Sequence, residues 1–360
     1  MKPFRFRYQI CYPLWIATIC LLVIGLLAVY SASIGYYKNY MPRQLMWVGM
    51  GLALAFFASW VHSREYRNLA APIFILSVLS LIAVLIFGTE RNNAKSWLGF
   101  GGLGIQPSEL AKIAVILIFG RFLADFEEHR YDWKYYLVSF VLLIIPLFLI
   151  ILQPDLGTAI IFIPVVFAMF FVSGTNKSIM ATTFFGGIAG VLAIIPFLGP
   201  WRLKRIKLAW TPENDPFKFG YQAVQSKIAI GSGSISGRGF LEGLQSKLNF
   251  LPERHTDFVF SVIGEEWGYF GCMAALFLYM ILILTAIYIA SRAKDVFGEV
   301  VAVGIAVMFA THFFLNIGMT IGLLPVIGIP LPMISYGGSA MITSLLAVGL
   351  LQSIYGRCNA

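Results

Sequence analysis

The stretch PERHTDF, residues 252–258, leads into the long apolar run Val262–Ala290. This run exceeds the roughly 20 residues that a helix needs to cross about 30 Å of hydrocarbon. An ionisable side chain at the edge of hydrocarbon is costly, so it points to a functional site. The stretch therefore predicts a membrane-spanning helix with chemistry at its start, and Asp257 is the candidate catalytic residue.

The composition extends this prediction to the whole chain. Its 360 residues are 59% hydrophobic and only 12% charged, whereas soluble domains are about 25% charged. In lipid the backbone must satisfy its own polar groups, which favours helices, and the chain lacks the alternation of a β-barrel. The first apolar run continues past signal-peptide length without an obvious cleavage site, so we expect a retained helix.

The expected fold class is an all-α polytopic membrane protein with about ten transmembrane helices. Residues 1–360 are predicted to form a single integral membrane domain. The expected helix cores are Pro13–Tyr30, Leu45–Trp60, Leu69–Gly88, Leu110–Ala124, Tyr135–Leu152, Leu156–Val172, Ile179–Leu198, Val262–Ala290, Val300–Thr320 and Leu331–Ile354.

The net charge of +9 is better explained by lysines and arginines that flank the helices than by nucleic-acid binding. In short connections these charges concentrate on the side of the N-terminus, which predicts that both termini are cytoplasmic. Residues 199–258 are then one large extracytoplasmic loop, basic and rich in glycine. Connections of this length are usually functional or disordered. Within the loop, residues 217–230 have the mixed spacing of an interfacial helix.

Two polar pairs fall inside the predicted helices. Glu109 and Lys112 lie three residues apart, so they share a helical face and can pair. Inside a membrane such a pair lines a cavity or serves as a structural ion pair, and both roles can hold together. His312 and Asn316 lie four apart and also share a face. We interpret them as satisfied polar groups of the bundle.

Several other candidates have a structural alternative. Asp257 and Asp155 each precede an apolar run, where an aspartate commonly caps a helix. Arg43 opens the second helix as an anion ligand or as an interfacial anchor. Lys95 is followed by a glycine-rich loop of the kind that forms anion-binding nests. The four cysteines match no metal motif, so we interpret them as small buried hydrophobic residues.

The segment GLLPVIGIPLPMISYGGS, residues 322–339, contains three prolines and four glycines and cannot form one continuous helix. Non-helical backbone at membrane depth is tolerated only where it is buried or lines a cavity. A helix that begins near Ser335 would direct backbone N–H groups at a bound anion. Ser335, Gly337 and Gly338 are therefore candidate ligands of an anionic group such as a pyrophosphate.

Six motifs together resemble the SEDS family (shape, elongation, division and sporulation). They are RQ from Arg43, QPSEL from Gln106, QPDLGT from Gln153, YQAVQSKIAIGSG from Tyr221, FLPERHTDFVFSVIGEEWG from Phe250 and GLLPVIGIPLPMISYGGS from Gly322. They occur in order over nearly the whole chain, which is far more specific than any one alone. The residues LNF at 248–250 favour the elongation members over the division and sporulation members.

The resemblance implies a GT-C-like peptidoglycan glycosyltransferase that acts in cell elongation and rod shape. It implies the substrate lipid II, a class B penicillin-binding protein as transpeptidase partner, the cytoplasmic (inner) membrane and an active site on the outer face. The family's essential acid in the large loop corresponds to Asp257, and its polar pair in the fourth helix to Glu109 and Lys112. The family allows Mg or Mn, and no organic cofactor is expected.

The expected mechanism has Asp257 accept the proton of the acceptor GlcNAc 4-hydroxyl while undecaprenyl pyrophosphate leaves the donor. Arg43, Lys95 and Lys112 are the candidate cations for the leaving group. Many members carry Arg directly before Trp97, where this chain has Ser96, so the pyrophosphate ligand there stays open. A lipid II flippase and a scaffold that only activates the partner are the alternative functions.

Overall fold

The computed structural model describes residues 9–34, 40–91, 94–99, 104–129, 132–197, 199, 203, 220–248 and 250–356. Most basic residues expected in the first part of the large loop lie outside the described residues, as do both chain ends.

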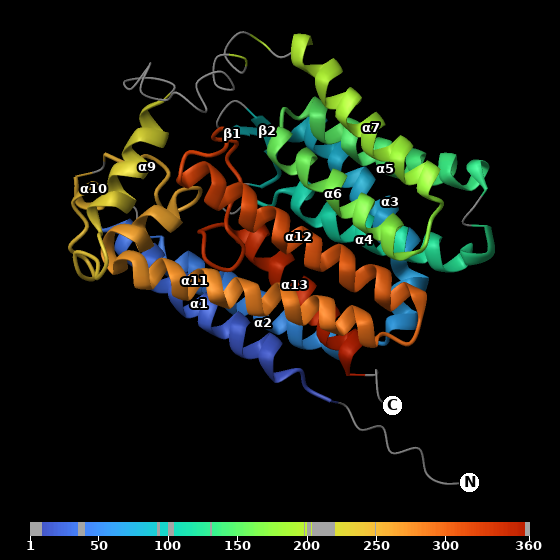
Figure 1. The fold of residues 1–360 in the computed structure, drawn as a ribbon, viewed down its shortest axis with the longest axis horizontal. Coiled ribbons are helices and arrows are strands. Elements are labelled where there is room, and N and C mark those ends of the chain that lie inside the picture. Colours follow the sequence, from blue (N-terminus) through green and yellow to red (C-terminus); the bar gives the residue numbers. More distant parts are fainter. Residues whose placement is uncertain are drawn as a thin grey trace.

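The described residues form a bundle of ten long helices (Figure 1) with short elements at its ends. A two-stranded antiparallel sheet and short helices fill the connections. The long helices are α1 (Tyr12–Ser33), α2 (Met41–Trp60), α3 (Ser63–Phe87), α4 (Pro107–Asp125), α5 (Trp133–Leu152), α6 (Leu156–Val172), α7 (Lys177–Ile194), α11 (Val259–Arg292), α12 (Val296–Thr320) and α13 (Gly338–Tyr355). The short elements are β1 (Thr89–Arg91), β2 (Ala94–Trp97), η1 (Glu127–His129), η2 (Ile195–Phe197), α9 (Tyr221–Ser232) and α10 (Leu244–Lys247).

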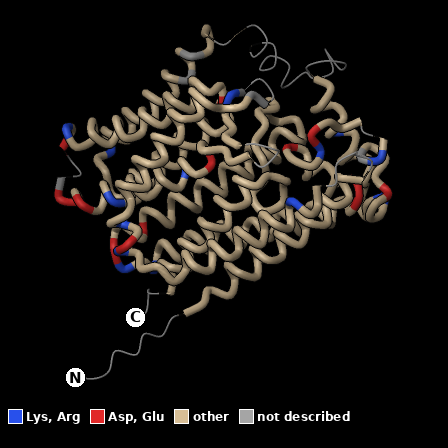
Figure 2. Tube along the Cα trace, turned by 180° about the vertical axis from the view of Figure 1, so that it is seen from behind, with Lys and Arg blue, Asp and Glu red and all other residues tan. Residues whose placement is uncertain are grey.

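Seven of these helices are long and apolar enough to cross a membrane, namely α1, α3, α5, α7 with η2, α11, α12 and α13. The chain is thus an all-helical polytopic membrane protein, as the composition predicted. Figure 2 shows charged residues gathered at the two ends of the bundle, with few in the band between them. This distribution agrees with the cost of placing charge in hydrocarbon.

Local sequence signals explain where several helices begin. Proline occupies the first turn of α1, α2 and α4, where its missing N–H costs nothing. The side chains of Asp132, Asp155 and Asn176 accept backbone N–H bonds at the starts of α5, α6 and α7. Asp155 therefore does cap its helix.

The bundle has two distinct ends. At one end, Gln352 near the end of α13 accepts the N–H of Cys11, just before α1, at 3.0 Å. At the other end, Arg254 donates to the carbonyl oxygens of Ala32 and Ile34 at the end of α1. The start of α1 and the end of α13 thus lie together, and the PERHTDF stretch lies at the opposite end.

The predicted last helix is wrong at its start. We expected it from Leu331, but α13 begins at Gly338, and residues 325–337 are irregular. The prolines of this segment stop a helix from forming earlier. Its backbone is tolerated at depth because it is enclosed by protein: Leu331, Met333 and Ile334 are buried. In the large loop, the helix expected over residues 217–230 is present as α9, Tyr221–Ser232, and residues 217–219 lie outside the described residues. Its position at the membrane interface stays a prediction.

Candidate active site

The turn that carries Asp257 is fastened to the end of α1 by Arg254. This arginine is fully buried. Its Nε donates to the Ala32 carbonyl at 2.7 Å and its Nη2 to the Ile34 carbonyl at 2.9 Å. A cation at a helix C-terminus satisfies carbonyl groups that have no partner within the helix and complements the helix dipole. These two hydrogen bonds compensate the buried charge and hold residues 252–258 against the end of α1.

His255 holds the same turn against two aromatic rings. Its imidazole stacks on Tyr40, with ring centroids 4.3 Å apart and planes at 15°, and lies 5.6 Å from Tyr336. Its backbone carbonyl accepts the N–H of Tyr336 at 2.8 Å. Burial lowers the pKa of His255 below its usual 6.5, Glu253 opposes this, and Arg254 adds to it. The neutral ring therefore suits this packing.

Ser335 connects the turn to the irregular segment before α13. Its hydroxyl donates to the Thr256 carbonyl at 2.6 Å and accepts the Leu331 N–H at 2.8 Å. Its own carbonyl accepts from the Gln44 amide at 3.2 Å. Both hydrogen bonds of the hydroxyl are made within the protein, so Ser335 connects the turn to the irregular segment in this structure.

Asp257 itself is half-buried and lies beside the irregular segment. Asn316 Nδ2 donates to the Asp257 carbonyl at 2.9 Å and to the Ile329 carbonyl at 2.7 Å. A Cβ added at Gly328 would come 3.3 Å from Asp257 Oδ2, and Gly328 has φ +77°. Glycine therefore provides both the backbone conformation and the space beside the carboxylate.

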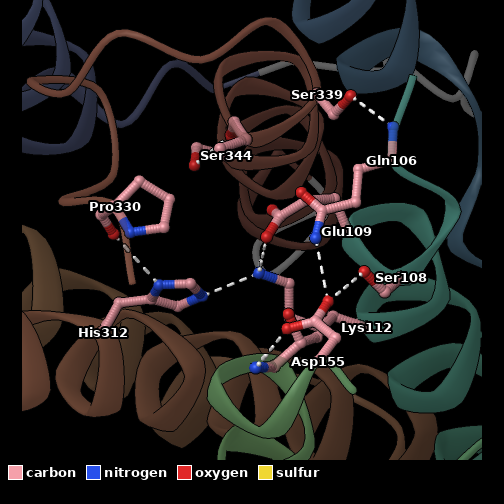
Figure 3. A network of polar contacts seen from close by, with 11 residues as sticks. Gln106, Ser108, Glu109, Lys112, Asp155, His312, Pro330, Ser339 and Ser344 are labelled. Atoms are coloured by element: carbon pink, nitrogen blue, oxygen red, sulfur yellow. Dashed lines mark hydrogen bonds and ion pairs between the residues drawn. The ribbon is translucent and has the colours of Figure 1, made fainter. Parts of the chain in front are cut away.

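Glu109 and Lys112 form a buried ion pair in α4 (Figure 3), with Lys112 Nζ 2.8 Å from Glu109 Oε1. The same ammonium lies 2.8 Å from His312 Nε2. An ammonium group only donates, which assigns Nε2 as the acceptor and Nδ1 as the protonated nitrogen that faces the Pro330 carbonyl at 3.3 Å. The pair is thus compensated by a third polar group rather than left as two isolated charges.

Asp155 joins two of the sequence motifs. Its Oδ2 accepts from Gln106 Nε2 and from the Ser108 hydroxyl, both at 2.8 Å, while its Oδ1 accepts the Thr158 N–H at 3.2 Å. The Gln106 N–H in turn donates to the Ser339 hydroxyl in the first turn of α13 at 2.8 Å. Asp155 therefore fixes the starts of α4 and α6 relative to each other.

His312 and Asn316 combine these contacts into one site. They lie one turn apart on α12, as their spacing predicted. Asn316 contacts the Ile329 carbonyl and His312 contacts the next one, that of Pro330, in the irregular segment. Through them, the buried Glu109–Lys112 pair is linked to the backbone of Asp257. The sequence predicts that His312 and Asn316 are satisfied polar groups of the bundle. Both ring nitrogens of His312 and the Nδ2 of Asn316 have partners, and those partners belong to the candidate site. Among the described residues, the buried Asn316 Oδ1 has no hydrogen-bond partner, so the prediction holds only in part for Asn316. The four-residue spacing of His312 and Asn316 was the only sequence signal of this link.

Of the two predicted cationic anion ligands outside α4, Arg43 lies next to residues of the candidate site, whereas Lys95 contacts the end of α3. Arg43 is exposed in the first turn of α2, between Tyr40 and Gln44, which both contact the site. Lys95 donates to the Leu85 and Ile86 carbonyls at the end of α3, at 3.0 and 3.2 Å. Lys95 therefore satisfies a helix C-terminus, and these contacts do not bring it to Asp257.

Gly337 and Gly338 do stand at the start of α13. Gly337 is half-buried, whereas Gly338 packs so closely on Trp47 that a Cβ would come 2.4 Å from the indole ring. The first N–H groups of α13 have no acceptor within the helix, as at any helix start. The start of α13 lies two residues after Tyr336, whose N–H donates to the His255 carbonyl in the turn of Asp257. The first N–H groups of α13 are therefore close in sequence to a direct contact with that turn.

Over the residues that the structure describes, no three His, Cys, Asp or Glu side chains form a group able to hold a metal, whereas Mg²⁺ is usually held by carboxylates together with substrate phosphates. Binding of Mg or Mn therefore stays a prediction.

Comparisons with known proteins agree with this architecture. The family model described as "Cell cycle protein", which covers FtsW, RodA and SpoVE, matches residues 12–358. The peptidoglycan glycosyltransferase MrdB of Escherichia coli is 40% identical over 94% of this chain and 91% of its own length. The peptidoglycan glycosyltransferase RodA of Treponema pallidum is 32% identical, covering 96% of this chain and 97% of the relative.

Two solved structures share the fold. A structure of a peptidoglycan synthase complex has a chain that matches with a TM-score of 0.82 and 29% identity, covering 98% of this chain and 99% of that one. RodA of Thermus thermophilus matches with a TM-score of 0.74 and 28% identity, covering 98% of each chain. The chain therefore belongs to the SEDS family of peptidoglycan glycosyltransferases.

Proposed function

We propose that this protein polymerises lipid II into glycan strands with Asp257 as the general base, in the service of cell elongation and rod shape. One observation carries the proposal: the backbone of Asp257 is fixed from several sides while its carboxylate lies beside a glycine. Asn316 of α12 and Ser335 of the irregular segment donate to carbonyl groups of the turn. Within the turn, Arg254 donates to the end of α1 and His255 stacks on Tyr40. A catalytic group needs such fixed geometry.

The proposed reaction is an inverting displacement. The 4-hydroxyl oxygen of the acceptor GlcNAc attacks the anomeric carbon of the donor MurNAc and passes its proton to the Asp257 carboxylate. The bond from that carbon to the pyrophosphate oxygen breaks, and undecaprenyl pyrophosphate leaves with the electron pair. A positioned base contributes about 10²–10⁴-fold to such a step.

The leaving pyrophosphate gathers negative charge, so fixed donors near it lower the barrier. Arg43 is favoured among the predicted cations because it is exposed on the turn of α2 that adjoins the site. The backbone N–H groups at Gly337 and Gly338 provide a helix start of the kind that binds phosphate. Lys95 is disfavoured because its ammonium contacts the end of α3.

Glu109 and Lys112 are assigned a supporting role. Both side chains are almost fully buried and pair with each other. The ammonium reaches His312 and, through it, the carbonyl of Pro330, close to Gly328 and Asp257. We infer that the pair sets the position of the irregular segment and thus of the space beside the catalytic carboxylate.

The partner proposed for this chain is a class B penicillin-binding protein, which would cross-link the strands made here. The solved relative with the TM-score of 0.82 is described as a peptidoglycan synthase complex in which polymerisation and crosslinking are coordinated. We further propose the cytoplasmic (inner) membrane, with both termini cytoplasmic and Asp257 on the outer face. The charge of the short connections supports this orientation.

The experiment is a gel of glycan products from lipid II, using purified protein with and without a class B penicillin-binding protein. Product chains that depend on this protein are the expected result. Translocation of lipid II in proteoliposomes without product chains would instead favour the flippase. If chains persisted after substitution of Asp257, Glu109 and Lys112 but vanished when the partner contact was broken, the scaffold would be favoured.

A further inference from the structure

A continuous apolar stripe runs along the outside of α1. Its members recur every three or four residues, the period of one helical face, and each is more than 40% exposed. They are Tyr12, Ile16, Ile19, Val23, Leu27 and Tyr30 on α1, and Ile34 directly after its last residue. Tyr12 and Tyr30 are 18 residues apart, or about 27 Å along a helix. That is close to the hydrocarbon thickness of about 30 Å, and tyrosines favour its two boundaries.

The large loop continues this stripe at the end that carries Asp257. Phe240 stacks on Tyr30, with ring centroids 6.4 Å apart and planes at 25°. Phe240 is itself 42% exposed. It therefore lies at the level where the stripe of α1 reaches the boundary between hydrocarbon and headgroups.

A second stripe ends under the same part of the loop. Beyond the break at Gly268, where φ is +64°, α11 continues with large side chains exposed from Tyr269 to Tyr288. These two tyrosines are about 28 Å apart along the helix. The Tyr269 N–H donates to the Ser234 carbonyl at 3.0 Å, and Ile235, one residue further, is 66% exposed. The loop thus meets α11 at the same boundary.

Backbone contacts hold this part of the loop at that level. The N–H groups of Arg238 and Gly239 donate to the Glu265 and Glu266 carbonyls, both at 3.0 Å. The Gln245 N–H donates to the buried Glu265 carboxylate at 2.8 Å. Segment 234–248 is therefore held against α11 by hydrogen bonds. Its apolar side chains are exposed in a segment whose position is fixed on the bundle.

We propose that segment 234–248 contacts the lipid bilayer at the end of the bundle that carries Asp257. Ile235, Phe240 and Leu244 enter the boundary between acyl chains and headgroups. Arg238, whose Nε donates to the Ser232 carbonyl, and Lys247, which pairs with Glu242 at 2.8 Å, are both exposed, and their remaining donors face the lipid phosphates. The occupant is lipid because the apolar set is continuous with two membrane-facing stripes. The contact fixes the depth of the large loop, and the inference does not depend on the proposed reaction.

The test uses the full chain in phospholipid vesicles, with its four cysteines replaced by alanine and a nitroxide attached at Phe240→Cys or Leu244→Cys. Collisions of the label are measured with oxygen, which concentrates in lipid, and with a water-soluble nickel chelate. Val23→Cys, midway along the stripe of α1, is the lipid-facing control. Glu128→Cys, exposed in η1, is the water-facing control.

The expected result is that labels at 240 and 244 collide several-fold more with oxygen than with the chelate, as at Val23→Cys but at shallower depth. Chelate collisions equal to those at Glu128→Cys would overturn the proposal. A label shielded from both reagents would also overturn it, because a protein would then cover the segment.

The unmodified chain gives a second readout if the cysteine-free protein does not fold. A phospholipid with a photoactivatable diazirine near its headgroup is crosslinked to the native protein in vesicles, and the adducts are mapped by mass spectrometry. Adducts within residues 234–248 are expected. Adducts on α1 and the second part of α11, with none in this segment, would contradict the proposal.

Discussion

Asn316 Nδ2 donates to the backbone carbonyl of Asp257 at 2.9 Å and, with its second hydrogen, to that of Ile329 at 2.7 Å. One buried amide thus joins the turn that carries the candidate base to the irregular segment before α13. His312, one turn earlier on α12, joins the next carbonyl to the buried Lys112. The helix α12 therefore acts as the frame that aligns two distant stretches of sequence.

Replacing Asn316 with leucine should release this alignment. The buried Ile329 carbonyl and the half-buried Asp257 carbonyl would lose their donor, and each buried group left without a partner costs about 1–3 kcal/mol in stability. The turnover number should fall by about 10²-fold, because small displacements of catalytic groups have effects of that size. Steady-state kinetics on lipid II and thermal unfolding measure the two effects. A variant with lower stability but unchanged turnover would show that Asn316 only supports the fold.

The buried pair in α4 should respond differently to single and double substitution. Glu109→Gln leaves the Lys112 ammonium without its counter-charge, which costs about 3–5 kcal/mol for a buried pair. Replacing both residues with leucine removes both charges and should recover most of that stability. Polymerisation should stay low in both variants. Glu109→Gln leaves the Lys112 ammonium beside His312 uncompensated, and the double variant removes the contact between Lys112 and His312. Full activity in the double variant would mean that the pair is purely structural.

Acid should weaken the packing around His255. Its folded-state pKa is lowered, chiefly by burial, whereas the unfolded chain titrates near 6.5. The unfolded state therefore takes up a proton first, and this contribution to stability is present above pH 6.5 and is lost as pH falls below it. Unfolding midpoints from pH 8 to pH 5 should decline less in His255→Phe than in the parent. Parallel declines would contradict the assignment.

Gly328 should not tolerate alanine. Its φ of +77° disfavours any side chain by about 1–2 kcal/mol, and the added Cβ would approach Asp257 Oδ2 at 3.3 Å. We expect lower stability and lower turnover. Gly190→Ala is the matched control, since a Cβ there meets nothing within 4 Å on an exposed face of α7. Equal behaviour of the two variants in unfolding and activity assays would refute this role for Gly328.

The sequence predicted the helical fold well because hydrophobic runs and prolines act locally. Ten runs were expected, and all ten regions contain a long helix in the described residues. The last helix was placed too early because the apolar residues Leu331, Met333 and Ile334 look helical in composition. Their burial in an irregular segment depends on contacts with distant elements, which hydropathy does not encode.

The site was predictable only in part. Asp257 and the Glu109–Lys112 pair were named from charge in apolar surroundings and from family motifs. Lys95 stays a predicted anion ligand, but its spacing did not indicate that its ammonium contacts the Leu85 and Ile86 carbonyls at the end of α3. Ser335 likewise stays a predicted ligand, but the sequence did not indicate that its hydroxyl donates to the Thr256 carbonyl. Both outcomes depend on where the chain folds back, which spacing alone cannot give.

The central claim is that the Asp257 carboxylate removes the acceptor proton, and Asp257→Asn tests it most directly. The amide keeps the size of the side chain but is not a base. Glu253→Gln, which alters a carboxylate on the same turn that accepts from Thr256, is the matched control. With purified protein, its class B partner and lipid II, the account predicts folded Asp257→Asn without glycan chains and an active Glu253→Gln. Parental polymerisation by folded Asp257→Asn would contradict it.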